Sequence, residues 1–162
     1  MYAPRNLYII NIMKHFIKII VLVALDQITK WLVNANMLLG KSVDLIPGVF
    51  SLTRVENYGA AWNSFEGQKL ILIVMPLIVM VIATGYLIKT AKKNSPVMNW
   101  SLVLVIAGGI GNQIDRIFAG KVTDMFDFHF WPVFNVADIC VVVGAILLCL
   151  GILFDKKYDK RN

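Results

Sequence analysis

Uncharged apolar blocks dominate the chain and predict helices that cross a membrane. Residues 70–88 and 97–114 carry no formal charge, and residues 134–154 carry a single acid, Asp138, near their start. A run of about 18 or more apolar residues is long enough to span a bilayer. We therefore expect a transmembrane helix at each of these three blocks.

The first apolar block is less regular, because Lys14 and Lys18 lie in its early part and Asp26 and Lys30 in its late part. We still expect a helix there and not a cleaved signal peptide, since no small-residue cleavage site follows and Asp26-Gln27 interrupts the stretch. The chain is thus predicted to be an α-helical integral membrane protein, with one membrane domain over residues 1–162. Its four transmembrane helices are expected at about 13–33, 70–88, 97–117 and 134–154.

Basic residues gather in the connections on one side of the predicted helices, and this asymmetry predicts the orientation. By the positive-inside rule that side is cytoplasmic, so both termini are expected inside and the loops at about 34–69 and 119–133 outside. Eight of the ten acids lie at or near the outer side. Ten of the 16 basic residues belong to the cytoplasmic side: Arg5, Lys14, Lys18, Lys89, Lys92, Lys93, Lys156, Lys157, Lys160 and Arg161.

The composition agrees with a membrane protein. Hydrophobic residues make up 58% of the chain and charged residues 16%, against about 45–50% and about 25% in soluble domains. These values exclude a cytosolic enzyme, a secreted disulfide scaffold and a disordered tail. Cys140 and Cys149 lie nine residues apart on opposite helix faces, so we expect no disulfide. The net charge of +6 follows from the topology and does not indicate a nucleic-acid partner.

The outer loops are predicted to be structured. Residues 45–55 read as a hairpin around Pro47-Gly48, with Phe50 and Leu52 on one face. Residues 60–65 are expected to form one or two turns of interfacial helix. Residues 126–131 alternate phenylalanine with other side chains, which favours a strand or ribbon at the membrane surface, where aromatic residues are enriched.

Polar residues of the predicted helices gather at their outer ends. Ionisable residues inside membrane spans are costly and are therefore candidates for a functional site. Spacings of three and four residues bring helical side chains onto one face. The candidates are Asp26 and Lys30 in the first helix, Asn112, Asp115 and Arg116 in the third, Asn135 and Asp138 in the fourth, and Asp124 in the second outer loop.

Several chemistries can be compared on these residues. A histidine metal site is not expected, because His15 and His129 are predicted on opposite sides of the membrane. No span offers the Ser/His pair of a rhomboid-like protease, and a Ser/Lys dyad through Ser42 or Ser64 lacks an obvious buried lysine. Of the chemistries compared, catalysis by carboxylates remains. Two carboxylates that share one proton can hydrolyse a peptide bond, the ionised one activating water and the protonated one donating to the carbonyl.

The pattern alone does not choose which acids form the pair. Asp124 and Asp138 flank a short aromatic loop that can bring them together. We interpret Asp26–Lys30 and Asp115–Arg116 as structural ion pairs, since each acid has a basic neighbour.

Three further positions are interpreted structurally. Asp127 is expected to be a solvated loop acid and His129 an interfacial side chain. The glycines at 108, 109 and 111 are expected to permit close helix contact, because small residues let membrane helices approach.

Five segments occur together in an order that resembles the bacterial lipoprotein signal peptidases, also called type II signal peptidases, which are membrane aspartic peptidases. The resemblance covers nearly the whole chain. The segments are Asp26-Gln27-Ile28-Thr29-Lys30, Asn57-Tyr58-Gly59-Ala60-Ala61-Trp62, residues 108–116 (GGIGNQIDR), Gly120-Lys121-Val122-Thr123-Asp124 and Phe134-Asn135-Val136-Ala137-Asp138.

The resemblance implies a catalytic dyad of Asp124 and Asp138, with no metal or cofactor. It also implies a small extracytoplasmic β-cradle and a lid over the site. Met125 departs from the family pattern, which often has phenylalanine there, and Asn63 stands where a small residue is commoner. The residues implied to position the dyad and the substrate are Asn57, Gly59, Asn112, Asp115, Arg116, Asn135 and Ala137.

The resemblance further implies the substrate and the location. The family's substrate is a prolipoprotein whose cysteine already carries diacylglycerol, and cleavage occurs just before that cysteine. The site would face outward from the bacterial cytoplasmic membrane, in a monomer surrounded by membrane lipids and open to family inhibitors such as globomycin.

Two other functional classes stay open at this point. Asp115-Arg116 followed by Gly120 and Asp124 loosely resembles the metal-binding acids of alcohol phosphatidyltransferases, which need a divalent metal and normally a cytoplasmic-facing site. A small proton-coupled carrier or assembly subunit would instead place its acids near the midplane of repeated halves. The predicted outer position of the acids and the lack of repeats count against both.

Overall fold

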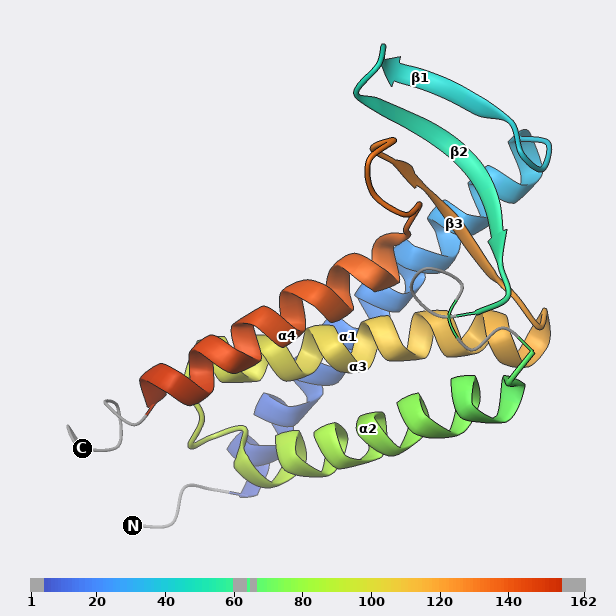
Figure 1. Cartoon of the computed structure of the whole chain (residues 1–162). Helices are drawn as coiled ribbons and strands as arrows, with labels where there is room; N and C mark the ends of the chain where they lie inside the picture. The colour runs from blue at the N-terminus through green and yellow to red at the C-terminus, as the bar shows by residue number, and fades with distance from the viewer. Residues whose placement is uncertain (1–4, 60–63, 65–66, 156–162) are drawn as a thin grey trace.

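The computed structural model describes residues 5–59, 64 and 67–155, and this part of the chain holds four long helices and three strands (Figure 1). The helices lie against one another, and the sheet covers one end of them, opposite the end where α1 begins and α4 finishes (Figure 1). The elements are α1 (Arg5–Asn36), β1 (Ser42–Ile46), β2 (Phe50–Asn57), α2 (Lys69–Thr90), α3 (Pro96–Phe118), β3 (Val122–Asp127) and α4 (Val136–Asp155).

Helix α3 is the centre of the bundle and contacts each of the other three helices. Its glycines make this possible, because each lies against a different neighbour, as the interpretation of close helix contacts predicts. At Gly108, a Cβ would collide with the Ala137 carbonyl of α4. At Gly109 it would lie 2.7 Å from Met80 Sδ of α2, and at Gly111 it would lie 2.6 Å from Asp26 Oδ2 of α1.

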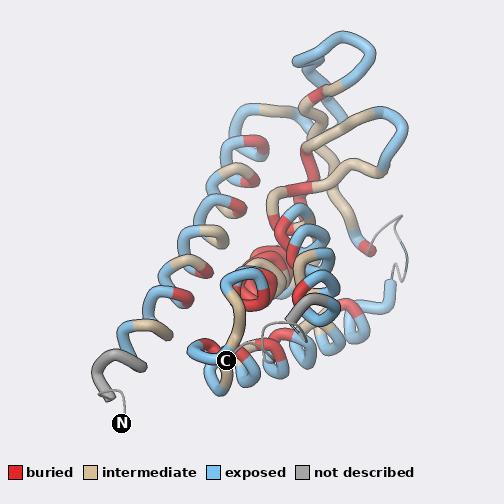
Figure 2. Tube along the Cα trace, turned by 90° about the vertical axis from the view of Figure 1, so that its left-hand side faces the viewer, coloured by how far each residue is buried: buried red, intermediate tan, exposed pale blue. Residues whose placement is uncertain are grey.

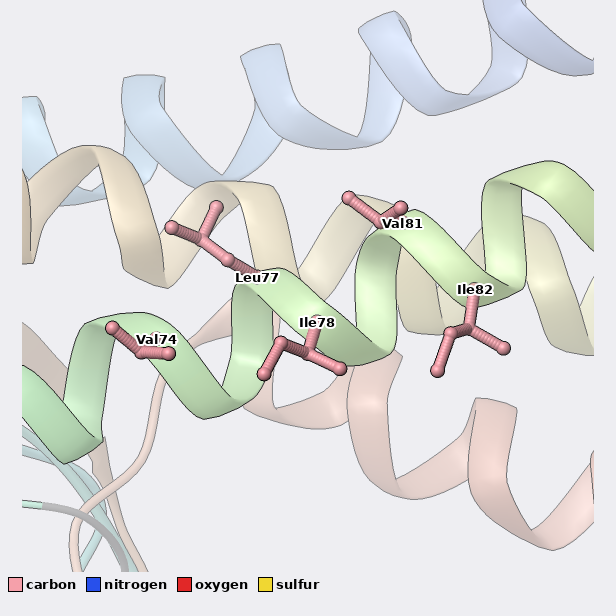
Figure 3. A pocket seen from close by; sticks show the side chains of 5 residues that line it. All are labelled: Val74, Leu77, Ile78, Val81 and Ile82. Atoms are coloured by element: carbon pink, nitrogen blue, oxygen red, sulfur yellow. The ribbon is translucent and has the colours of Figure 1, made fainter.

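Within the described residues, three helices are long and apolar enough to cross a membrane, namely α2, α3 and residues Val136–Leu153 of α4. Buried positions recur along one side of α1, the side toward the other helices (Figure 2). The buried residues of α2 include Leu72, Met80 and Leu87. The outward face of α2 is lined by apolar side chains alone along a shallow groove (Figure 3). Such a face suits contact with lipid tails, in which an exposed polar group would be costly. The groove is formed by Val74, Leu77, Ile78, Val81 and Ile82.

A proline in α2 is compensated by a side chain of α3. Pro76 has no N–H, so the carbonyl of Leu72 one turn earlier loses its usual helical donor. The buried Gln113 side chain donates its amide to that carbonyl at 2.8 Å. The bond fixes α2 against α3 directly beside Asn112.

The predicted hairpin is confirmed. β1 and β2 pair antiparallel across a turn at Pro47-Gly48, and β2 pairs antiparallel with β3 to give the order β1-β2-β3. The sheet is tied to the end of α1, because Arg54 donates to the Met37 carbonyl at 2.7 Å and Asn34 donates to the Thr123 hydroxyl at 3.0 Å. β3, which carries Asp124, is thereby held against the bundle.

The third strand differs from the prediction for residues 126–131. β3 begins earlier, at Val122, and ends at Asp127. The chain turns there because the Asp127 carboxylate accepts the backbone N–H of His129 at 2.8 Å, and His129 adopts a φ of 64°. Phe128 then folds back onto Phe50, with ring centroids 4.7 Å apart.

Helix boundaries also differ from the expected ones. α1 is longer at both ends than the predicted 13–33, and α4 begins at Val136 and not at 134, because Asn135 acts as its N-cap. Cys140 is buried and Cys149 exposed, and both are free thiols, as expected. The interfacial helix expected at 60–65 lies outside the described residues, apart from Ser64.

Candidate active site

Hydrogen bonds join polar side chains of α1, α3, β3 and the start of α4, most of them buried. These elements come together at the end of the bundle that the sheet covers (Figure 1). The prediction that the outer-end residues converge is therefore confirmed within the described part of the chain. The most buried members of this cluster are Asp26, Lys30, Asn112, Asp124 and Asn135.

Asn135 joins the two aspartates that the sequence singles out. Its side-chain amide donates to Asp124 Oδ1 at 2.7 Å, and its backbone N–H donates to Asp138 Oδ2 at 3.1 Å. The Asp138 backbone N–H donates in return to Asn135 Oδ1 at 2.9 Å. This reciprocal pair is a capping box at the start of α4. A single residue thus fixes both carboxylates.

Two further amides complete the contacts of the carboxylates. Asn57 Nδ2 donates to Asp124 Oδ2 at 3.0 Å, and Asn112 Nδ2 donates to Asp138 Oδ1 at 2.8 Å. All four carboxylate oxygens therefore accept a bond from a neutral N–H. Among the described residues, neither Asp124 nor Asp138 forms an ion pair.

The electrostatic surroundings favour a proton on this pair. Asp124 is only 2% exposed. Its burial, reinforced by the neighbouring carboxylate of Asp138, raises the pKa of Asp124 to about 6, against the opposing hydrogen bonds from Asn57 and Asn135. Carboxylates that interact in this way lose their protons in coupled steps, so the raised pKa of Asp124 belongs to a pair and not to an isolated acid.

A second cluster surrounds the ammonium group of Lys30. Its Nζ lies 2.8 Å from Asp26 Oδ2 and 2.8 Å from Asp115 Oδ2, and it donates to Asn112 Oδ1 at 3.1 Å. The Asp26–Lys30 pair is confirmed. The Asp115–Arg116 pair is wrong, because the carboxylate of Asp115 turns toward Lys30 on the neighbouring helix.

Arg116 instead reaches the segment after β2. Its guanidinium donates to the Gly59 carbonyl at 3.1 Å, while the Gly59 N–H donates to Asn57 Oδ1 at 2.9 Å. Gly59 therefore contributes through its backbone. The same holds for Ala137, whose N–H donates to Asp26 Oδ1 at 2.9 Å.

Sequence reasoning overlooked Gln27 as a site residue. Its amide lies within 3.1 Å of both Asp26 Oδ2 and Asp115 Oδ1, and within 3.2 Å of the Gly111 carbonyl. It thus joins the two acids that flank Lys30. The available signal was its place three residues before Lys30, on the same helix face.

A Ser-His-Asp grouping in the sheet was also overlooked. Ser51 Oγ lies 3.1 Å from His129 Nε2, and His129 Nδ1 lies 3.6 Å from Asp127 Oδ1. Ser51 is nevertheless fully buried, and its hydroxyl donates to Asp44 at 2.6 Å. A serine that is inaccessible and gives its proton to a carboxylate is a structural link and not a nucleophile.

The same contacts correct the interpretation of Asp127. It is not a solvated loop acid, since its side chain is 17% exposed and also accepts the Thr53 hydroxyl at 3.0 Å. The His129 side chain is 42% exposed at the edge of the sheet.

Comparison with known proteins decides the family. The family model described as "Signal peptidase (SPase) II" matches residues 18–154, a range that includes both aspartates and the Lys30 cluster. The chain belongs to the signal peptidase II family. It is therefore an enzyme and a peptidase, and the resemblance seen in the sequence is confirmed.

Relatives within the signal peptidase II family cover almost all of the chain. The lipoprotein signal peptidase of Bacillus pumilus (strain SAFR-032) is 40% identical, over 93% of this chain and 99% of its own. That of Lactococcus lactis subsp. lactis (strain IL1403) is 44% identical, over 86% and 93%.

Solved structures of bacterial membrane enzymes share the fold. One has a TM-score of 0.84 at 30% identity and covers 92% of this chain and 93% of its own. A second has a TM-score of 0.79 at 31% identity, with 88% and 94% covered. The phosphotransferase and carrier alternatives lose their support, because the matching family model and the named relatives are signal peptidases.

Proposed function

We propose that the protein is a membrane aspartic endopeptidase that removes the signal peptide from diacylglyceryl-modified prolipoproteins, cleaving just before the lipidated cysteine. The observation that carries this proposal is a pair of aspartates, Asp124 buried and Asp138 half-buried. Asp124 and Asp138 are bridged by Asn135 and receive neutral amide donors on every carboxylate oxygen. Such a pair can hold one proton and one negative charge, which is the state that acid/base hydrolysis requires.

The chemistry follows from that state. The ionised aspartate takes a proton from water, whose oxygen attacks the scissile carbonyl, while the protonated aspartate donates to the carbonyl oxygen. The tetrahedral intermediate then collapses as the C–N bond breaks. The aspartate that took the water proton gives it to the leaving amine, and the other aspartate takes back a hydroxyl proton from the intermediate as the carboxyl product forms. The amides of Asn57, Asn112 and Asn135 keep both carboxylates in place during these transfers, and no metal or cofactor takes part.

The substrate backbone is proposed to bind at a small cleft next to Asn57, whose amide holds Asp124. Asn57 contacts Asp124, and Arg116 adds a cation from the last turn of α3. The peptide backbone of the substrate would therefore meet polar groups there. An inhibitor of the family such as globomycin would compete for this cleft. The cleft is lined by Asn57, Tyr58, Lys69, Leu72, Ile73, Arg116 and Gly120.

We propose α1 as a fourth membrane span. With four spans, both termini lie on one side of the membrane and the dyad lies toward the other. The charges of Asp26 and Lys30 are buried and paired, and the Lys18 ammonium lies 4.0 Å from the ring centroid of Trp100. From Phe16 to Leu32 the exposed residues of α1 are all apolar, as lipid contact requires. They include Phe16, Ile17, Ile20, Val21, Leu25, Ile28 and Trp31.

The orientation follows from the basic residues of the inner connection and termini, which the positive-inside rule assigns to the cytoplasm. The dyad, the sheet and the cleft then lie at the outer leaflet of the bacterial cytoplasmic membrane. A diacylglycerol anchor on the substrate would hold the scissile bond at this level and lower the entropic cost of positioning it. A monomer contains all of these groups.

The test is cleavage by purified protein in detergent. A diacylglyceryl-modified precursor and its unmodified counterpart are incubated with the enzyme, with and without a metal chelator. We expect cleavage of the modified precursor only, at the same rate in chelator. Equal cleavage of both precursors would contradict the substrate assignment, and activity lost to chelator and restored by magnesium would contradict the metal-free mechanism.

A further inference from the structure

Lys30 has no part in the reaction described above, yet only the side chain of Asn112 separates it from Asp138. Its side chain is 4% exposed. Its ammonium group forms ion pairs with the carboxylates of Asp26 and Asp115, at 2.8 Å each, and donates a hydrogen bond to the side-chain oxygen of Asn112 at 3.1 Å. Because an ammonium group can only donate, every atom that faces it must be an acceptor.

That constraint decides how the Asn112 amide is turned. Asn112 Oδ1 accepts from Lys30 at 3.1 Å and from Asn135 Nδ2 at 3.1 Å, so Asn112 Nδ2 faces Asp138 and donates to it at 2.8 Å. If the amide were turned over, its NH₂ group would oppose an ammonium and its carbonyl would oppose a carboxylate. Both contacts would be repulsive, so the cation holds Asn112 in the orientation that serves Asp138.

Asp26 contacts the segment of Asp138 directly, by a bond that does not involve Lys30. Asp26 Oδ2 contacts Lys30, while Asp26 Oδ1 accepts the N–H of Ala137, the residue directly before Asp138. That N–H is one of the free donors in the first turn of α4. Helix α1 therefore holds Asp138 through its side chain, by way of Asn112, and through its backbone, by way of Ala137.

We infer that Lys30 is a positioning residue for the reaction, which orients the Asn112 amide toward Asp138, and not only half of a helix-stabilising ion pair. The inference rests on the proposed function of Asp138. A purely structural lysine would affect the amount of folded protein. A positioning lysine affects turnover by folded protein, and it does so only while Asn112 is present to transmit the effect.

The test is a double-mutant cycle between Lys30→Met and Asn112→Leu, with kcat and KM measured on folded, purified protein. We expect Lys30→Met to lower kcat about 100-fold, the scale of loss when a reacting group is misplaced, with KM changed less than about threefold. The double variant should be no slower than Asn112→Leu alone, since two mutations that act through one contact do not add. Lys18→Met, the same substitution elsewhere on α1, is the matched control and should keep kcat within about twofold.

A second pair of variants covers the case in which Lys30→Met does not fold. Removing the cation leaves Asp26 and Asp115 buried without a counter-charge, which is strongly destabilising. Adding Asp115→Asn to Lys30→Met restores the net charge that the cluster has in the native protein. We expect this double variant to turn over about 100-fold more slowly than Asp115→Asn alone, with similar KM.

Two results would overturn the inference. Lys30 is merely structural if folded Lys30→Met keeps its kcat, or if its effect multiplies with that of Asn112→Leu. These outcomes are separate from failure of the proposed function, which is judged by Asp138→Asn. An inactive Asp138→Asn beside a fully active Lys30→Met would leave the dyad standing and remove only the positioning role.

Discussion

At the scale of single residues, Asp124 and Asp138 differ from ordinary buried acids because their partners are neutral amides and not cations. Each carboxylate oxygen has one N–H donor, so the charge is accommodated without being neutralised. A neighbouring cation would hold both acids ionised, and neither could then donate a proton. Lys30, the buried lysine nearby, contacts Asp26, Asp115 and Asn112 instead.

We expect Asp124→Asn and Asp138→Asn each to reduce cleavage of a lipidated precursor at least about 1,000-fold, because an amide can neither take a proton from water nor donate a carboxylic proton. Each change keeps the side-chain shape and loses about one hydrogen bond, worth about 1 kcal/mol. The proteins should therefore remain folded and inserted. Cleavage assays and thermal unfolding in detergent check both statements, and normal turnover by either variant would refute the dyad.

Asn57→Ala should shift the pH dependence of the reaction. The Asn57 amide stabilises the ionised form of Asp124 and so opposes the effects that raise its pKa to about 6. Without that amide the pKa of Asp124 rises further, and the alkaline limb of kcat/KM, where the shared proton is lost, moves to higher pH.

The measurement for Asn57→Ala is kcat/KM across about pH 5 to 9. Thr53→Val on the same strand is the control, because it removes a hydroxyl bonded to Asp127 and not to Asp124. Its limb should stay where that of the native enzyme lies. A shift to lower pH in Asn57→Ala would contradict the assigned role of this amide.

At the scale of the elements, the packing of α3 against α4 sets the position of Asp138. Gly108→Val should be destabilising by more than about 2 kcal/mol and should lower activity, because a side chain there collides with the Ala137 carbonyl and lies 3.0 Å from the Val141 backbone nitrogen. Gly85→Ala on α2 is the matched control. A Cβ at Gly85 meets nothing within 4 Å, and alanine favours a helix over glycine by about 1 kcal/mol. Thermal unfolding in detergent and cleavage assays compare the two, and a stable, active Gly108→Val would refute the packing argument.

The bond from Gln113 to Leu72 offers a suppressor test. Gln113→Met should destabilise the protein by about 1–3 kcal/mol, since it leaves the Leu72 carbonyl without a donor. Adding Pro76→Ala restores a backbone N–H one turn after Leu72, so the double variant should be more stable than Gln113→Met alone. If the second change brings no recovery in thermal unfolding, the carbonyl freed by Pro76 is not the reason for Gln113.

What the sequence could predict of these elements depends on whether the deciding interaction is local. The hairpin at Pro47-Gly48 and the pairing of Asp26 with Lys30 depend on residues a few positions apart, so turn chemistry and helix spacing are sufficient. The partner of Asp115 was predicted wrongly, because Arg116 is next to it in sequence while Lys30 reaches it from another helix. The early end of β3 was missed because the turn depends on a side chain, Asp127, that binds the backbone of His129.

At the scale of the whole molecule, the positions of the loops relative to the bilayer follow from charge. We expect Ser42→Cys, in the sheet, to react with a membrane-impermeant maleimide in intact cells, and Lys93→Cys, between α2 and α3, to react only after lysis. Both are made in a background with Cys140→Ala and Cys149→Ala, which removes the two native thiols. Labelling of Lys93→Cys in intact cells would invert the proposed orientation.

At this scale the family resemblance predicted more about the site than the residue patterns did. Residue patterns alone brought the polar groups to one level and left open which acids react. The ordered segments in the sequence singled out Asp124 and Asp138, and the structure adds the contacts that distinguish them from Asp26 and Asp115. No spacing rule connects Asn57, Asn112 and Asn135, because they come from three separate elements that only the folded chain brings together.

The capping box at Asn135 and Asp138 has a consequence for biosynthesis. The hydrogen bonds that begin α4 are also the ones that hold Asp138 in place, and α4 follows every other described element along the chain. A nascent chain that has inserted only α1, α2 and α3 carries Asp124 without its partner. With the proposed dyad as the catalytic centre, we expect no peptidase activity until α4 has been synthesised and has packed against α3.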